Sequence, residues 1–220
     1  MNLAAITGME AEARIVRDAG FKAMASGGVE ANTLSAADFC LRAGAEALLS
    51  FGIAGALASH LQPGALLMPR GIREEDGTRH AVDTELHRQA EKILAAAGIA
   101  VETGDMLGAV TAAASPAEKN ELARRCYAIA IDLESHLIAR VAAQAGRRFI
   151  VLRAISDSAT QALPPAAVTG LGADGKPALG RVLASVARDP RQIPALIHLA
   201  GGTRRALSAL TQALAVRPFA

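Results

Sequence analysis

The stretch Ile131-Asp132-Leu133-Glu134-Ser135-His136 and the later run FIVLRAISD at residues 149–157 decide how this chain should fold. The first stretch is typical of a buried strand that breaks into a helix at a carboxylate, and the second of a buried strand that ends in Ser156-Asp157. Between them, apolar residues recur at helical spacing: Leu137, Ile138, Val141, Ala142 and Ala145. The pattern predicts a strand–helix–strand unit, and such crossovers give parallel strands.

Ligands of open α/β sheets bind beyond the carboxyl ends of the strands. The predicted unit would bring two carboxylates, Glu134 and Asp157, to that edge. Working outward from the unit, strands are predicted at residues 3–6, 22–26, 47–51 and 65–69, and helices at residues 9–16, 36–43, 84–97 and 179–187. Ser115-Pro116 is a typical helix start. The alternation predicts an α/β fold, with a single domain over residues 1–220.

Glycine and proline mark three further features of the chain. Gly52-Ile53-Ala54-Gly55 follows a predicted strand without phosphate-loop spacing, so a tight turn is favoured over a ligand-binding loop. Residues 161–177 hold three prolines and three glycines, which predicts a long mobile loop beside the site. Gly201-Gly202 should kink or split the helical pattern that follows Pro190.

Composition and charge exclude several classes of function. Half of the 220 residues are hydrophobic but only 3% are aromatic, which argues against a binder of sugars or single-stranded nucleic acid. The net charge is +2 and no basic stripe is present, so nucleic acid is not expected as a partner. Cys40 and Cys126 are far apart, which fits a reducing, cytoplasmic compartment. Neither a signal peptide nor an apolar run of about 18 residues is seen.

Three segments together resemble the nucleoside phosphorylase/nucleosidase superfamily over nearly the whole chain. They are Ile6-Thr7-Gly8-Met9-Glu10-Ala11-Glu12, Ser50-Phe51-Gly52-Ile53-Ala54-Gly55, and Asp132-Leu133-Glu134 with Arg153-Ala154-Ile155-Ser156-Asp157. Glu134-Ser135-His136 and Leu163-Pro164-Pro165-Ala166 make the chain most similar to hopanoid-associated phosphorylases, which remove adenine from adenosylhopane. The resemblance implies a three-layer α/β/α sandwich with a central mixed sheet.

The resemblance also implies an enzyme that cleaves the N-glycosidic bond of an adenine nucleoside. Asp157 would protonate N7 of the leaving purine, Glu12 would orient and deprotonate water, and Glu134 would bind the ribose hydroxyls. Arg153 and Ser156 would hold these carboxylates in place. The remaining residues expected to contact substrate are Met9, Ile53, Ala54, Gly55 and Leu133.

Departures from the family pattern bear on the reaction. The family's phosphorylases bind phosphate through arginines at the positions of Glu12 and Ser50, and neither arginine is present here. A carboxylate at position 12 would repel phosphate, so these residues favour hydrolysis. Phosphate nevertheless stays a candidate co-substrate, since other arginines could supply contacts: Arg14, Arg70 or Arg73. Leu133 and Ile53 replace a Met and a Ser that are frequent in relatives.

Two other functions stay open: a 5′-methylthioadenosine/S-adenosylhomocysteine nucleosidase, and a non-catalytic nucleoside-binding protein. No cofactor or metal is expected, because His60, His80, His87 and His198 lack metal-ligand spacing. Asp132 is predicted to cap a helix, and His136 either to line the pocket mouth or to be partly exposed. We expect a cytoplasmic homodimer, with peripheral membrane contact if the nucleoside is lipid-linked.

Overall fold

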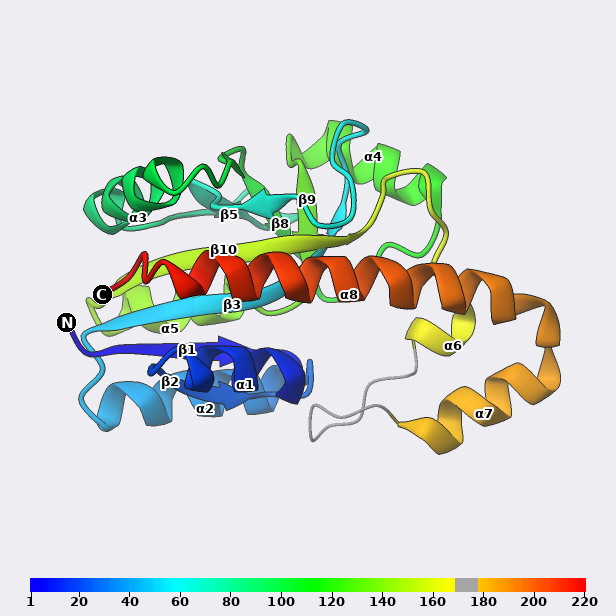
Figure 1. Ribbon diagram of the computed structural model, residues 1–220, viewed down its shortest axis with the longest axis horizontal. Coiled ribbons are helices and arrows are strands. Elements are labelled where there is room, and N and C mark those ends of the chain that lie inside the picture. The colour runs from blue at the N-terminus through cyan, green and yellow to red at the C-terminus, as the bar shows by residue number, and fades with distance from the viewer. Residues whose placement is uncertain (169–177) are drawn as a thin grey trace.

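The computed structural model describes residues 1–168 and 178–220, whose strands form one mixed sheet (Figure 1). The strands are β1 (Leu3–Thr7), β2 (Lys22–Ala25), β3 (Ala47–Ala56), β4 (Leu66–Leu67), β5 (Gly71–Arg73), β6 (Arg79–Ala81), β7 (Val101–Glu102), β8 (Met106–Gly108), β9 (Ala130–Asp132) and β10 (Arg148–Asp157). Their order is β6-β5-β8-β9-β3-β10-β4-β7, and β1 and β2 continue from β3.

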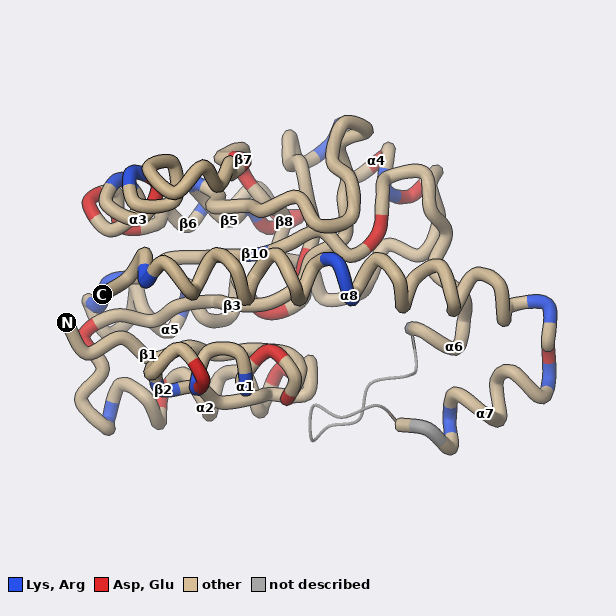
Figure 2. The backbone as a smooth tube through the Cα atoms, viewed as in Figure 1, with Lys and Arg blue, Asp and Glu red and all other residues tan. Residues whose placement is uncertain are grey.

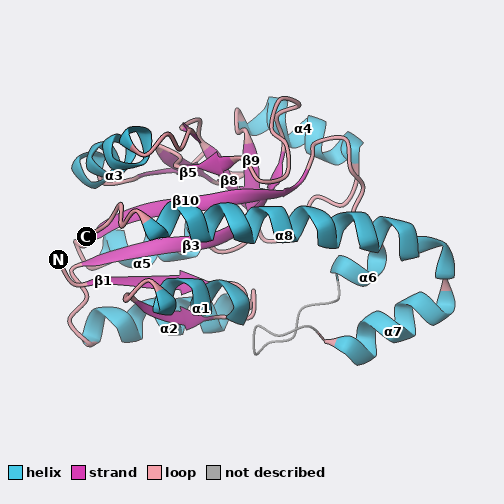
Figure 3. Ribbon diagram, viewed as in Figure 1, coloured by secondary structure: helices cyan, strands magenta, loops and turns pink. Residues whose placement is uncertain are grey.

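Helices cover both faces of this sheet. They are α1 (Glu10–Asp18), α2 (Glu30–Arg42), α3 (Thr84–Ala96), α4 (Pro116–Cys126), α5 (Ser135–Gln144), α6 (Pro165–Val168), α7 (Leu179–Arg188) and α8 (Ile193–Ala215), with a 3-10 turn, η1 (Pro190–Gln192), before α8. Outer helices such as α3 carry charged residues of both signs (Figure 2). The long α8 crosses in front of β3 and β10, and α5 lies behind them (Figure 3).

The apolar side chains of the central strands alternate between two cores. Leu48 and Val151 pack with α2 and α5 on one face, whereas Leu49 and Leu152 pack with α1, α3 and α8 on the other. Successive residues of a strand point to opposite faces, so continuous apolar runs are what a sheet covered on both faces requires. The predicted three-layer sandwich with a central mixed sheet is confirmed.

The direction of β9 differs from the prediction. β10 pairs in parallel with β3, with Arg148 opposite Ala47, but β9 pairs antiparallel with the end of β3, where Ile131 lies opposite Gly55. The expected parallel β9–α5–β10 crossover is therefore wrong, because β3 separates the two strands and β9 runs the opposite way. Apolar runs indicate that a strand is buried, but they carry no information about its direction.

The glycine run after residue 51 belongs to β3, so the predicted tight turn is also wrong. β3 continues to Ala56, and Gly52 within it has φ 153°. A Cβ atom on Gly52 would lie 2.6 Å from both Arg153 Nη1 and Glu12 Oε1. Gly52 therefore leaves space for two side chains of the site, which is the role of a glycine where a strand is closely approached.

The segment predicted as a long loop is only partly described. Residues 165–168 form the short helix α6, and residues 169–177 lie outside the described residues. The helix after Pro190 is not split at Gly201-Gly202, because α8 runs unbroken from Ile193 to Ala215. A Cβ on Gly202 would lie 2.0 Å from the carbonyl oxygen of Ser156, so this glycine lets α8 touch β10 beside Asp157.

Beyond this contact, the first two turns of α8 project past the sheet together with α6 and α7 (Figure 1). We call α6, α7 and residues 190–201 the helical arm. Gln192 ties the arm together, since its Oε1 accepts the backbone N–H of Ala166 at 3.0 Å and its Nε2 donates to the carbonyl of Ser185 at 2.8 Å. Among the described helices, none combines the length and apolar character that crossing a bilayer requires.

The two adjacent glycines of α8 provide a matched test of this packing. Gly202→Ala should destabilise the fold by about 1–3 kcal/mol, as overpacking of a tight contact does. Gly201→Ala should stabilise it by about 0.5–1 kcal/mol, because outside its chain neighbours and the backbone of its own helix no atom lies within 4 Å of the added Cβ, and alanine favours a helix interior. Chemical denaturation measures both values, and equal effects of the two substitutions would contradict the contact with Ser156.

Candidate active site

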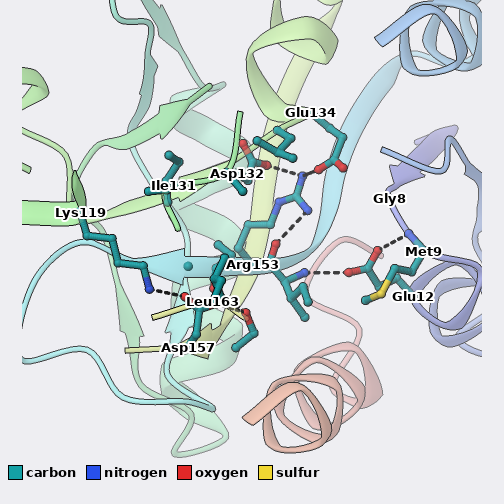
Figure 4. Close-up of a pocket in the computed structure, with 17 residues that line it drawn as sticks. Gly8, Met9, Glu12, Lys119, Ile131, Asp132, Glu134, Arg153, Asp157 and Leu163 are labelled. Carbon is teal, nitrogen blue, oxygen red and sulfur yellow. Dashed lines mark hydrogen bonds and ion pairs between the residues drawn. The ribbon is translucent and has the colours of Figure 1, made fainter. Parts of the chain in front are cut away.

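One pocket at the carboxyl ends of β1, β3 and β10 gathers every residue predicted for the site (Figure 4). Its wall includes Met9, Glu12, Ile53, Ala54, Gly55, Leu133, Glu134, Arg153, Ser156 and Asp157. The other residues of the wall are Gly8, Ala112, Ala113, Lys119, Ile131, Asp132 and Leu163. The cavity has a volume of about 200 Å³.

Glu12 is buried in the first turn of α1 and is held by two backbone groups. Its Oε2 accepts the N–H of Met9 at 2.7 Å, and its Oε1 accepts the N–H of Ile53 at 2.9 Å. Burial raises the pKa of Glu12, and the nearby Arg153 charge and these hydrogen bonds oppose that shift. Glu10, the other carboxylate of this turn, pairs with Arg17 at 2.7 Å. Of these two carboxylates, only Glu12 lines the pocket.

Arg153 lies at the centre of the buried polar groups, with a side chain only 1% exposed. Its Nη2 donates to Ser50 Oγ at 2.7 Å and to Glu134 Oε2 at 3.3 Å, and it also pairs with Asp132. Arg153 therefore connects β10 to β3 and to the β9–α5 junction. The expectation that this arginine holds the carboxylate of Glu134 agrees with these distances.

Three carboxylates surround this single guanidinium, so the cluster carries excess negative charge. Burial raises the pKa of Glu134 to about 7, and the charges of Asp132 and Glu12 add to the rise while Arg153 opposes it. A carboxylic acid that titrates near neutral pH can exchange protons during a reaction, and such groups gather at functional sites.

The residues on either side of Glu134 have structural partners. Asp132 is the last residue of β9, and Glu134 occupies the N-cap position of α5 that was predicted for Asp132. Asp132 Oδ2 accepts the Ser135 hydroxyl at 2.5 Å, and Asp132 also pairs with Arg153. His136 is 3% exposed and packs against Gly108, so it occupies neither of the two positions predicted for it. In the described parts of the chain, no three His, Cys, Asp or Glu side chains are grouped to hold a metal ion.

Asp157 is fixed through both of its oxygens. Ser156 Oγ donates to Oδ1 at 2.6 Å, and Lys119 Nζ donates to Oδ2 at 2.5 Å (Figure 4). The first contact agrees with the predicted role of Ser156. Sequence reasoning missed Lys119, which follows the predicted helix start at Ser115-Pro116 but gives no sign that its side chain reaches a site.

The ionisable side chains of the pocket lie on two separate sides of it. Figure 4 shows Asp157 with Lys119 on one side and Glu12 and Glu134 on the other. Apolar side chains complete the wall: Met9, Ile53, Ala54, Ile131, Leu133 and Leu163. An acid and a base held apart by an apolar surface can act on two atoms of one flat, partly polar ligand.

Comparisons with known proteins bear on the family and the fold. The family model described as the phosphorylase superfamily matches residues 15–186. The fold is similar to that of 5′-methylthioadenosine/S-adenosylhomocysteine nucleosidase from Neisseria meningitidis, solved in complex with methylthio-immucillin-A. The TM-score is 0.74 and the identity is 20%, over 97% of this chain and 96% of that chain. Among curated protein sequences, none matches the chain.

Two further solved structures share the fold. Futalosine hydrolase of Helicobacter pylori has a TM-score of 0.75 and 14% identity over 97% of this chain and 95% of that chain. An S-adenosylhomocysteine nucleosidase from Streptococcus pyogenes, in complex with 5-methylthiotubericidin, has a TM-score of 0.75 and 17% identity over 98% and 95%. The chain belongs to the phosphorylase superfamily. It is an enzyme of the nucleoside phosphorylase and nucleosidase class.

The raised pKa of Glu134 should make stability depend on pH. Between pH 4.5 and about 7 the unfolded chain releases this proton while the folded protein retains it, so stability falls as pH rises through that window. We expect the difference in melting temperature, wild type minus Glu134→Gln, to decrease from pH 4.5 to 7 and then to level off. Thermal scans of both proteins test this.

Glu121→Gln is the matched control, since Glu121 is 68% exposed on α4. Its melting temperature relative to wild type should show no step between pH 4.5 and 7. A constant difference between wild type and Glu134→Gln across the same pH range would contradict the raised pKa.

Proposed function

We propose that the protein hydrolyses the N-glycosidic bond of an adenine nucleoside and releases adenine. One observation carries this proposal: a single pocket holds a hydrogen-bonded carboxyl group, Asp157, apart from two buried carboxyl groups with raised pKa, Glu12 and Glu134. The similar solved nucleosidases, which are described in complex with methylthio-immucillin-A and 5-methylthiotubericidin, support a nucleoside as the ligand.

In the proposed reaction, the bond between ribose C1′ and purine N9 breaks and its electron pair moves into the purine. Asp157 gives a proton to N7, which neutralises the leaving base. Glu12 takes a proton from a water molecule whose oxygen bonds to C1′. A base with a raised pKa accepts that proton more readily near neutral pH. Glu134 accepts hydrogen bonds from the ribose hydroxyls, and charge-assisted bonds of this kind are strong.

The charges around the pocket favour water over phosphate as the nucleophile. Among the described residues of the wall, Arg153 and Lys119 are the cations, and both already pair with carboxylates. The three arginines considered as phosphate contacts, Arg14, Arg70 and Arg73, are absent from the wall. Arg73 instead pairs with Asp105 at 2.8 Å. A phosphate dianion would meet the excess negative charge of the Arg153 cluster.

Product analysis with adenosine-type nucleosides tests the reaction. Wild type should release adenine and free ribose at the same rate with and without phosphate. Asp157→Asn should lower kcat by roughly 10² or more, because it removes the proton donor. Asp38→Asn, at an exposed position of α2, is the control and should keep wild-type activity.

Three results would count against this assignment. An Asp157→Asn enzyme with more than about a tenth of wild-type kcat would exclude Asp157 as the general acid. Ribose 1-phosphate as product, with turnover dependent on phosphate, would mean phosphorolysis. A wild-type protein that binds nucleosides without cleaving any of them would favour the non-catalytic alternative.

For the 5′ substituent we propose a long apolar group, as in a lipid-linked nucleoside. The helical arm starts at the pocket, because Leu163 lines the wall and Gly202 touches the Ser156 carbonyl. Among the described side chains of the arm, the exposed large apolar ones are Leu183 at 67%, Ile193 at 42% and Ile197 at 68%. An apolar tail leaving the pocket could bury such surface at roughly 25 cal/mol per Å².

The charge of the arm supports contact with an anionic lipid surface. Between residues 178 and 198, Arg181, Arg188 and Arg191 accompany a single acidic residue, Asp189. Figure 2 shows basic residues along α7 and at the corner between α7 and α8. Exposed apolar residues next to arginines are typical of helices that lie at a membrane surface. Peripheral contact would bring the pocket to a substrate that resides in the bilayer.

Kinetics and vesicle binding test this specificity. Adenosine derivatives with long hydrophobic 5′ extensions should have a higher kcat/KM than S-adenosylhomocysteine, whose zwitterionic tail needs charged partners. Vesicles with anionic lipids should sediment wild type but not Leu183→Asp/Ile197→Asp. Val110→Asp, at an exposed apolar residue that is not on the arm, is the control and should sediment like wild type.

A preference for S-adenosylhomocysteine would instead identify a 5′-methylthioadenosine/S-adenosylhomocysteine nucleosidase. Equal sedimentation of wild type and the arm variant would remove the membrane contact. A second copy of the chain covering the arm would appear as a dimer that the arm substitutions dissociate.

A further inference from the structure

Lys119 is a buried cation that the proposed reaction does not yet use. Its side chain is 1% exposed, and its Nζ makes three hydrogen bonds: to Asp157 Oδ2 at 2.5 Å, and to the carbonyl oxygens of Ser158 and Gln161 at 2.9 Å each. An ammonium group has three N–H donors, so this environment satisfies all of them. Lysine is almost never fully buried without such partners.

These bonds hold the catalytic carboxylate in one orientation. Ser156 Oγ binds Oδ1 of Asp157 and Lys119 binds Oδ2, so each oxygen has one fixed donor and a remaining lone pair for substrate. The segment after β10 is also tied to the residues just before α4, because the N–H of Leu163 donates to the carbonyl of Ala114 at 2.8 Å. Asp157 is therefore positioned by α4 as well as by its own strand.

The ion pair raises a question about the proton for the leaving base. Lys119 Nζ is the hydrogen-bond donor to Asp157 Oδ2 at 2.5 Å, yet Asp157 must give a proton to the purine. In the resting pair that proton resides on Nζ, one hydrogen bond away from the carboxylate. The pair as a whole holds the proton that the reaction needs.

We propose that Lys119 is a positioning residue that also stores the proton Asp157 delivers, an inference that rests on the proposed function. As the C1′–N9 bond breaks, an N–H bond of Lys119 breaks and its proton moves to Asp157. The proton of the Asp157 carboxyl moves to purine N7, forming a new N–H bond. The neutral amine and the ionised carboxylate remain, and the amine takes a proton from solvent after the products leave.

A substrate pair with different leaving groups tests this inference directly. Adenosine needs a proton on its leaving base, whereas 4-nitrophenyl β-D-ribofuranoside releases a stable phenolate that needs none. Lys119→Met should lower the highest kcat between pH 5 and 9 for adenosine by roughly 10² to 10⁴, the range of general acid catalysis. The loss with the nitrophenyl riboside should be at least tenfold smaller.

Two further variants separate proton storage from structure. Lys119→Arg keeps a cation beside Asp157 but does not release a proton, so it should bind adenosine with a KM near that of wild type without recovering kcat. Arg124→Met replaces an exposed residue of the same helix and should match wild type on both substrates. Circular dichroism and melting temperatures establish that each variant is folded.

Several outcomes would overturn the inference. Equal losses of Lys119→Met on both substrates would indicate a purely structural lysine. Wild-type adenosine turnover in Lys119→Met at any pH from 5 to 9, or recovery of kcat in Lys119→Arg, would show that no stored proton is needed. If wild type cleaves adenosine and Asp157→Asn does not, these outcomes reject only the role of Lys119. A wild type that cleaves no nucleoside rejects the proposed function itself.

Discussion

The buried guanidinium of Arg153 is the constraint on which the arrangement of the site depends. A charge removed from water is costly unless it is paired and hydrogen-bonded, and an arginine does not lose its proton to escape that cost. Its partners come from separate parts of the chain: Ser50 on β3, and Asp132 and Glu134 at the β9–α5 junction. Folding must bring these segments to β10 to pair the buried charge. The same contacts therefore stabilise the fold and fix the geometry of the site.

The Arg153 cluster contains more carboxyl groups than cations, and this excess suits the proposed chemistry. One cation faces three carboxyl groups, which leaves the region around Glu12 and Glu134 electrostatically negative. Breaking a glycosidic bond places positive charge on the ribose, and preorganised negative groups stabilise charge that develops in the transition state. In the free enzyme, burial raises the pKa of Glu134 and the charges of Asp132 and Glu12 add to the rise, whereas a cationic sugar would oppose it.

The residues that the sequence singled out lie together in one pocket, whereas part of the topology that assembles them differs from the prediction. Asp132-Leu133-Glu134 and the run from Arg153 to Asp157 lie at strand ends, where the local pattern is informative. The pocket wall includes the first three residues together with Arg153, Ser156 and Asp157. The antiparallel direction of β9 was not predictable, because an apolar run looks the same in both directions. Gly202 looked like a helix breaker, although its missing side chain serves contact with a distant strand.

Lys119 shows why part of the site could not be found in the sequence. A lysine in a helix is usually solvated, and its neighbours in the chain give no sign of burial. Its three hydrogen bonds go to residues 38–42 positions further along the chain. Such a contact is defined by how α4 packs on the segment after β10, which no local pattern records.

The molecule contains both exposed and buried ion pairs, and the two kinds should respond differently to salt. Pairs such as Arg88 with Glu85 stand in solvent with side chains 63% and 51% exposed, where dissolved ions screen charges over about 10 Å at 0.1 M salt. Arg153 and Glu134 are 1% and 10% exposed, so counterions cannot come between them. A higher ionic strength should therefore weaken the surface ion pairs while leaving the electrostatic interactions in the pocket almost unchanged.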